Sequence, residues 1–215
     1  MGDDLATGEQ IYTLKAGVAR IRGLGLRLGA DRRIVYATQP DVQWIDSEPH
    51  ASLTAELQTI NLDRWPAVGA VQARITVRRV VDVVHGGFIG AADPLPDNAV
   101  IEVEQVKQGA TVYDSGASWN LVAGQIDWSP TGPEPAPGTT YQATYKCNIV
   151  ADVLNQTTRT FQVQGALPGT QVLTSYNFAL RRYDRLVLNT DGVPEWVRGV
   201  SSAFNPLKPR TPSNC

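Results

Sequence analysis

The chain has 215 residues, 42% of them hydrophobic and 19% charged, and its formal net charge is −2. This length is sufficient for one large or two small domains with hydrophobic cores, and the near-neutral charge argues against a nucleic-acid partner. The sequence contains no run of about 18 apolar residues and no signal-peptide pattern, so we expect neither a membrane span nor a secretory leader.

The N-terminal part of the chain is polar and then alternates. Residues 1–10 predict a flexible N-terminus, and from Ile11 the apolar residues recur at every second position, as in a half-buried strand. Ala19 and Ile21 share one phase of this pattern. The leucines beyond Gly23 follow the other phase, and they are Leu24, Leu26 and Leu28. A change of phase at a glycine predicts a β-bulge or a tight corner.

The next segments are mostly typical of strands. Residues 32–36 and 42–45 predict two short strands separated by a turn. Residues 47–62 fit either a short helix, from the spacing of their leucines, or a strand, from their threonine and isoleucine content, and we favour strand or irregular backbone. The valine-rich residues 71–84 predict a further strand, because β-branched side chains lose entropy in a helix.

A long connection then precedes another strand. Glycines and prolines in residues 85–98 predict an exposed loop or a domain boundary. This segment lacks the lysine and the following helix that a phosphate-binding loop requires. Residues 99–106 alternate, with Ile101 and Val103 expected on the inward face.

Residues 113–147 read as strand, turn, strand, proline-braced loop and strand. Asp114 and Gly116 favour chain reversal, and the prolines of residues 130–138 exclude a central strand there. The segment after this loop alternates strictly. Its predicted inward side chains are Tyr141, Ala143, Tyr145 and Cys147. This pattern predicts a half-buried antiparallel strand with a buried, reduced thiol.

The strongest hairpin signal lies near the C-terminus. Two apolar segments flank a connection that ends in Asp191 and Gly192. We expect Trp196 to face Leu186 or Leu188 across this pair.

These elements predict a mainly β protein, built of β-sandwich or barrel-like modules with a small C-terminal β-hairpin region and a Pro-rich tail. We divide the chain into a flexible N-terminus (residues 1–10), a β-rich main domain (11–154), a C-terminal hairpin region (155–202) and a Pro-rich linker (203–215). Because a hairpin alone is marginally stable, the hairpin region is expected to pack on the main domain or on a partner chain.

Two segments carry a resemblance to a known family. The first is Gly-x-x-Asp-Trp-Ser followed by Glu-Pro-x-Pro-Gly-x-x-Tyr at residues 124–141, and the second is RRYDRLVLNTDGVPEWVRG at residues 181–199. AGVARIRGLGLRL at residues 16–28 and SEPH at residues 47–50 match more weakly. The chain resembles a family of tailed-bacteriophage tail and baseplate structural proteins, known mainly as a domain of unknown function.

The resemblance implies a structural component of a phage virion tail or baseplate, assembled in the host cytoplasm. Such a protein would self-associate as a homo-oligomer and connect to neighbouring baseplate or tail-fibre proteins. The main alternative is a host receptor or glycan-binding β-module at the tail tip. A tail-associated depolymerase is a third hypothesis, which would need two converging carboxylates. We expect the protein not to be an enzyme.

The densest charged cluster gives the candidate subunit-contact site. It comprises Arg181, Arg182, Tyr183, Asp184 and Arg185, with Trp196 on the return strand. Guanidinium groups suit bidentate pairing across interfaces, which favours a contact patch. An equally good interpretation is an ion-paired strand rim, in which Asp184 orients an arginine within the chain.

No other pattern indicates chemistry, and we expect no catalytic residue, cofactor or metal site. His50 and His85 are not at ligand spacing with another histidine or a cysteine. The carboxylate pairs considered for glycan cleavage are Asp46 with Glu48, Glu102 with Glu104, and Asp184 with Asp191. The tryptophans are expected to pack in cores more often than to stack on sugars, and they are Trp44, Trp65, Trp119, Trp128 and Trp196.

Overall fold

The computed structural model describes residues 2–4, 9–21, 23–36, 39–213 and 215. The predicted fold class is confirmed, since 56% of the chain is strand and the described residues contain no helix. Accordingly, no helix in the described ranges is long and apolar enough to cross a membrane. The strands are β1 (Gly2–Asp4), β2 (Glu9–Leu14), β3 (Gly17–Ile21), β4 (Leu24–Leu28), β5 (Arg32–Tyr36), β6 (Val42–Ala51), β7 (Gln58–Asn61), β8 (Ala67–Val84), β9 (Ala92–Pro94), β10 (Val100–Gln108), β11 (Thr111–Tyr113), β12 (Asn120–Val122), β13 (Gln125–Asp127), β14 (Thr140–Ala151), β15 (Thr160–Val163), β16 (Gln171–Ala179), β17 (Arg185–Leu188) and β18 (Pro194–Val197).

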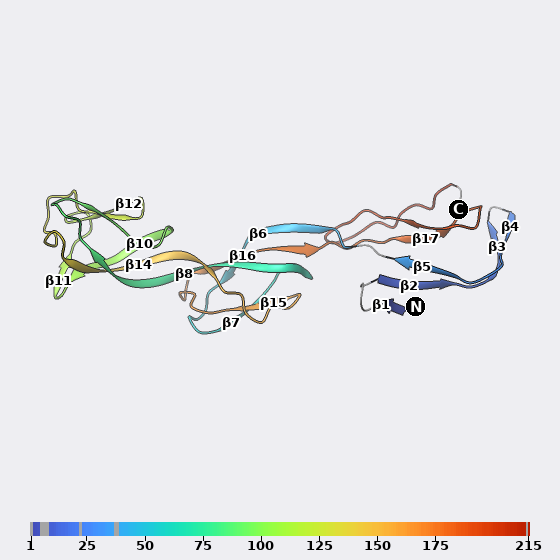
Figure 1. Cartoon of the computed structure of the whole chain (residues 1–215), viewed down its shortest axis with the longest axis horizontal. Helices are drawn as coiled ribbons and strands as arrows, with labels where there is room; N and C mark the ends of the chain where they lie inside the picture. Colours follow the sequence, from blue (N-terminus) through green and yellow to red (C-terminus); the bar gives the residue numbers. More distant parts are fainter. Residues whose placement is uncertain (1, 5–8, 22, 37–38, 214) are drawn as a thin grey trace. The chain divides into compact units, whose positions relative to one another are not determined.

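The chain forms two compact units. Unit 1 contains residues 1–43 and 178–215, and unit 2 contains residues 44–177. In Figure 1, unit 1 contains both blue strands, from the N-terminal part of the chain, and orange-red strands, from the C-terminal part. These units divide the chain differently from the predicted ranges, because the two ends of unit 1 are brought together by contacts that no local pattern reveals. Of the N-terminal residues predicted to be flexible, 1 and 5–8 lie outside the described residues, whereas β1 pairs with β2.

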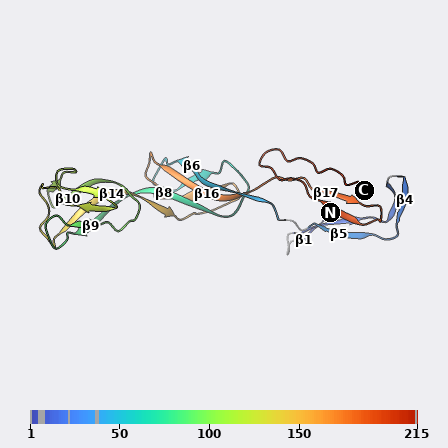
Figure 2. The ribbon, with the colours of Figure 1, turned by 90° about the horizontal axis from the view of Figure 1, so that it is seen from above.

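Unit 2 is organised around a curled, half-barrel sheet of six strands, in the order β11-β10-β14-β8-β16-β6. Its centre is the antiparallel pair β8 and β14, which keeps register from Thr140 opposite Val84 to Ala151 opposite Ala73. Figure 2 shows β10 beside β14 on the same sheet. Two smaller sheets, β12-β13-β9 and β15-β7, complete the unit.

The predicted alternation of β14 is confirmed. The side chains at every second position, Tyr141, Ala143, Tyr145 and Cys147, are at most 2% exposed. They belong to one hydrophobic core that also contains Trp119 and Trp128. Cys147 is free and buried, and burial raises the pKa of its thiol.

Two other sequence predictions in unit 2 have mixed outcomes. The strand over residues 99–106 is present as β10, but Ile101 is 52% exposed and does not face inward. The register of β10 against β14 shifts between Val100 and Glu102, and this bulge breaks the alternation. Strand is confirmed over much of residues 47–62, since β6 continues to Ala51 and β7 follows.

Unit 1 contains the sheet β1-β2-β5 and the two-stranded pairs β3-β4 and β17-β18. The predicted C-terminal hairpin is confirmed, with Leu186 opposite Trp196. The change of phase near Gly23 is a hairpin turn, because Ile21 pairs with Leu24 and both therefore lie on one face. Arg22 lies outside the described residues.

Together, β2, β3, β4 and β5 form one long ribbon, as the blue strands of Figure 1 show. Leu14 pairs with Arg32 and Gly17 pairs with Leu28, so two residues on one side oppose three on the other. At this bulge, the Lys15 ammonium lies 2.7 Å from the Asp31 carboxylate. The ribbon therefore changes register between its inner part, β2 and β5, and its outer part, β3 and β4.

Candidate functional site

The predicted contact cluster in unit 1 is built around Arg182, whose side chain is only 8% exposed. Its Nε and Nη2 atoms donate to the two carboxylate oxygens of Asp184 at 2.8 and 3.0 Å. Its Nη1 atom donates to Asp41 Oδ2 at 2.5 Å. These hydrogen bonds, first of all those to Asp184, raise the pKa of Arg182. The guanidinium group is thus committed to two carboxylates of its own chain.

Asp184 is equally enclosed, with a side chain 5% exposed. Besides Arg182, the Tyr36 hydroxyl donates to its Oδ2 and the Gly199 amide donates to its Oδ1 at 3.0 Å. Burial would raise the pKa of Asp184, but the hydrogen bonds from Arg182, Tyr36 and Gly199 outweigh it, and the pKa lies below its ordinary value. The ion-paired interpretation therefore holds for this pair.

The other predicted contact residues divide into two kinds. Trp196 packs within unit 1, with its ring centroid 4.5 Å from that of Tyr36, and Arg185 donates to Thr211 Oγ1. In contrast, Arg181 is exposed, and Tyr183 is 50% exposed with Lys208 5.9 Å from its ring centroid. A contact role, which stays a prediction, falls to these two residues.

Large apolar side chains are also exposed on unit 1. Those that are more than 60% exposed are Val18 (80%), Leu24 (61%), Val200 (74%), Phe204 (75%) and Leu207 (72%). The first two belong to the β3-β4 hairpin, and the other three follow β18. Sequence alternation could not show that Val18 and Leu24 are exposed, because a half-buried strand and an exposed hairpin share the same pattern of period two.

A second cluster, in unit 2, joins Glu48, His50 and Asp63. One ligand-type atom from each lies within 4.8 Å of the others. Glu48 and His50 are two residues apart on β6, so their side chains share a face. Asp63 comes from the connection between β7 and β8. His50 Nε2 lies 2.9 Å from Glu48 Oε1.

Glu48 is held in place by neighbours of the same unit. The buried Tyr176 hydroxyl donates to Glu48 Oε2 at 2.7 Å, and the Asp63 amide donates to Oε1 at 3.0 Å. Burial and the hydrogen bond to Glu48 raise the pKa of Tyr176. Ligand spacing in the sequence did not predict this cluster, because His50 has no second histidine or cysteine near it. The one available signal was Glu-Pro-His at strand spacing, since the approach of Asp63 depends on the fold.

His85, the other histidine, belongs to a buried polar network. Asp93 Oδ2 is 2.8 Å from His85 Nδ1 and accepts hydrogen bonds from Trp128 Nε1 and the Tyr141 hydroxyl, both at 2.9 Å. The Gly86 amide donates to Asp93 Oδ1 at 2.8 Å. His85 and Asp93 are at most 2% exposed. The network holds the glycine-rich connection against the aromatic core. His85 Nε2 lies 3.5 Å from Glu134 Oε2 and, like His50 Nε2, is buried without a hydrogen bond.

Each acid pair considered for glycan cleavage has at least one carboxylate that makes another polar contact within the chain. Glu104 pairs with Arg78 at 2.6 Å, and Lys146 bridges Glu102 and Glu104 at 2.9 and 3.1 Å. Asp46 accepts a hydrogen bond from Ser175 at 2.9 Å. With Asp184 paired to Arg182, these carboxylates take part in intrachain polar contacts.

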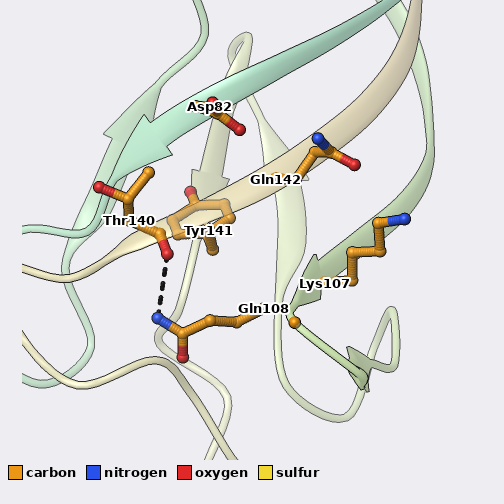
Figure 3. Close-up of a pocket in the computed structure, with 7 residues that line it drawn as sticks. Asp82, Lys107, Gln108, Thr140, Tyr141 and Gln142 are labelled. Atoms are coloured by element: carbon orange, nitrogen blue, oxygen red, sulfur yellow. Dashed lines mark hydrogen bonds between the residues drawn. The ribbon is translucent and has the colours of Figure 1, made fainter.

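A surface pocket of about 300 Å³ lies over the β8-β14-β10 part of the sheet. Figure 3 shows its lining, which is Asp82, Lys107, Gln108, Gly109, Thr140, Tyr141 and Gln142. The Gln108 amide donates to the Thr140 carbonyl at 3.0 Å. Tyr141 is 2% exposed and its hydroxyl is bound to Asp93, so it offers no ring face for sugar stacking.

Comparisons with known proteins place the chain in a family. Neither the curated proteins nor the solved structures yielded a match. A family model does match, over residues 1–215, and its description is "Domain of unknown function (DUF4815)". Because the match spans the whole sequence, the chain belongs to the DUF4815 family.

Proposed function

We propose that the protein is a structural component of a phage virion tail or baseplate, which self-associates and connects to neighbouring baseplate or tail-fibre proteins. The resemblance of residues 124–141 and 181–199 to tail and baseplate proteins supports the setting. The observation that carries the assembly role is the β3-β4 hairpin of unit 1.

This hairpin has two open edges. In the part of the chain that the structure describes, β3 and β4 pair with each other and with no third strand. Each outer edge therefore presents unpaired backbone donors and acceptors, which is the usual template for adding a strand from another chain. A two-stranded pair is also marginally stable in water by itself. Pairing with a strand of another subunit would satisfy the backbone groups of an open edge and would stabilise the hairpin.

The two faces of the hairpin differ. Cross-strand partners share a face, so the face of Ala19 and Leu26 also carries Ile21 and Leu24. Leu26 lies against the turn at Gly192, whereas Leu24, near the hairpin tip, is 61% exposed. On the opposite face, Val18 is 80% exposed between Arg20 and Arg27. The hairpin thus exposes an apolar side chain on each face, with arginines beside Val18, and exposed apolar side chains next to arginines are common in protein interfaces.

The glycan-binding alternative has weaker support. It would need exposed aromatic rings around a groove with amide or acidic lining. The pocket of Figure 3 has the amides, but its aromatic residue is buried. Trp44 and Trp65 are exposed by 49% and 47%, but neither lines that pocket.

The proposal predicts that the purified protein is an oligomer, and that acidic substitutions in the β3-β4 hairpin lower its mass. We would measure mass by light scattering for the wild type and for Val18→Glu with Leu24→Glu, which should dissociate. The matched control is Val150→Glu with Ile101→Glu, since these residues of unit 2 are 75% and 52% exposed. Circular dichroism would verify that both variants keep the β-sheet signal.

A second measurement mixes each protein with tail proteins purified from disrupted particles. The wild type and the control should form mixed complexes, and the hairpin variant should not. A wild-type protein that stays monomeric and forms no complex with the tail proteins would overturn the proposal. Retention of that monomer on immobilised host polysaccharide would favour the receptor-binding alternative.

A further inference from the structure

We propose that Glu48, His50 and Asp63 form a binding site for one divalent transition-metal ion, and that Zn²⁺ is the ion that fits them best. The site lies within unit 2 and does not depend on the assembly role proposed for unit 1.

The donor set has the chemistry of such a site. An imidazole nitrogen with carboxylate oxygens suits Zn²⁺, whereas Mg²⁺ and Ca²⁺ prefer oxygen donors alone. Bonds of about 2.0–2.1 Å in a tetrahedral arrangement place ligand atoms about 3.3 Å apart. The three ligand atoms already lie within 4.8 Å of one another, and His50 Nε2 is 2.9 Å from Glu48 Oε1. Small side-chain rotations would therefore bring all three onto one ion.

His50 Nε2 is the atom that points to a ligand. It is buried from solvent and makes no hydrogen bond, although Glu48 Oε1 is 2.9 Å away, because the contact lacks hydrogen-bond geometry. A buried nitrogen without a partner is unfavourable, and such atoms are rare in folded proteins. A metal ion bound to His50 Nε2 would give this nitrogen a partner. The same ion could bind Glu48 Oε1, which is 2.9 Å from Nε2.

The carboxylate of Glu48 is positioned as metal ligands usually are. Its side chain is 7% exposed, and Tyr176 and the Asp63 amide each donate to one of its oxygens. Hydrogen bonds of this kind orient a ligand and hold it ready for the ion. Asp63 itself is exposed, so solvent can reach the fourth coordination position and the ion can exchange.

The competing interpretation is an ion pair between His50 and Glu48. That pair makes no use of the Asp63 carboxylate, whereas the metal site requires it. Asp63→Asn therefore separates the two interpretations. The substitution keeps the backbone amide that bonds to Glu48 and changes only an exposed side chain, so the fold should survive.

The experiment is a calorimetric titration of the full chain with Zn²⁺ after treatment with a chelator. Zinc also binds thiolates, so all proteins carry Cys215→Ser. We expect one Zn²⁺ per chain, with the affinity reduced at least tenfold by Asp63→Asn and also by His50→Gln. Asp152→Asn, an exposed acid of unit 2 outside the cluster, is the matched control and should bind as the parent does.

Cobalt substitution gives a readout besides affinity. Co²⁺ in the parent protein should give the visible absorption of a low-coordinate site with nitrogen and oxygen ligands, and Asp63→Asn should weaken that absorption. Absence of Zn²⁺ binding, or binding that Asp63→Asn and His50→Gln leave unchanged, would overturn the proposal and leave the ion pair. Binding of Ca²⁺ or Mg²⁺ in preference to Zn²⁺ would also contradict it.

Discussion

Unit 2 buries five large aromatic side chains to 2% exposure or less, which are Trp128, Tyr141, Tyr145, Tyr176 and Phe161. The buried apolar residues that the structure describes in unit 1 are Leu28, Ile34, Phe178 and Val187. Unit 1 instead encloses the arginine and the aspartate of its central ion pair, Arg182 and Asp184. One unit is thus stabilised mainly by aromatic burial, and the other relies more on directional polar contacts.

This difference bears on what each unit can do. Aromatic burial is favourable by itself and needs no partner. An enclosed ion pair contributes little net stability, because desolvation offsets the attraction, but it fixes geometry. A unit with a small core, fixed geometry and exposed apolar residues is suited to gain stability by binding.

The largest effect is expected in the aromatic core of unit 2. The Trp128 ring lies with its centroid 5.3 Å from those of Tyr113 and Tyr141, and its Nε1 donates to Asp93. Trp128→Ala should lower the free energy of unfolding by about 3–5 kcal/mol, because it opens a cavity and removes a donor from a buried carboxylate. Denaturant titration measures the change.

Trp44→Ala is the matched control, since Trp44 is 49% exposed in the same unit. Its effect should stay below about 1 kcal/mol, in the range of surface substitutions. Equal losses for the two variants would contradict the aromatic core as the basis of unit 2.

The next effect concerns the ion pair of unit 1. Arg182→Ala leaves the enclosed Asp184 without its cation, and we expect a loss of about 3 kcal/mol in the free energy of unfolding. Arg181→Ala, one residue away and exposed, should change it by less than about 0.5 kcal/mol. The comparison uses thermal or denaturant unfolding of both variants. Similar values for the two would show that the pair does not hold unit 1.

The smallest effect is a dependence on pH. The pKa of Asp184 is lowered in the folded state, so the folded carboxylate resists protonation more than the unfolded one. Its contribution is therefore present above the ordinary aspartate pKa of about 3.9 and is lost as the pH falls through the lower folded value. At pH 6, Asp184→Asn should melt below the wild type, and the gap should narrow at pH 3. A gap that is constant with pH would refute this linkage.

The sequence predicted the local elements of both units better than their assembly. Strict alternation identified β14 because each inward side chain is buried, and Asp191-Gly192 located the C-terminal hairpin. Ile101 was placed wrongly because a bulge has no sequence signature in one chain. The pairing of chain ends in unit 1 depends on contacts such as Arg182 with Asp41, which are far apart in sequence.

For the candidate sites too, local patterns were visible in the sequence, whereas contacts between distant residues were not. The charged cluster was visible as a run of residues, but the sequence could not tell the enclosed Arg182 from the exposed Arg181, since both precede the same strand. Two of the three residues of the proposed metal site, Glu48 and His50, lie at the spacing that places them on one face of a strand. Asp63 required the fold, because it comes from the connection between β7 and β8, and no local pattern predicts that this connection lies beside β6.

The interruption of unit 1 by unit 2 also imposes an order of events during synthesis. A ribosome completes residues 44–177 before it adds any residue from 178 onward. Unit 2 therefore has all of its strands while unit 1 still lacks β17, β18 and the arginine that pairs with Asp41. A chain that terminates just after β16 would carry the strands of unit 2 together with an unfinished unit 1.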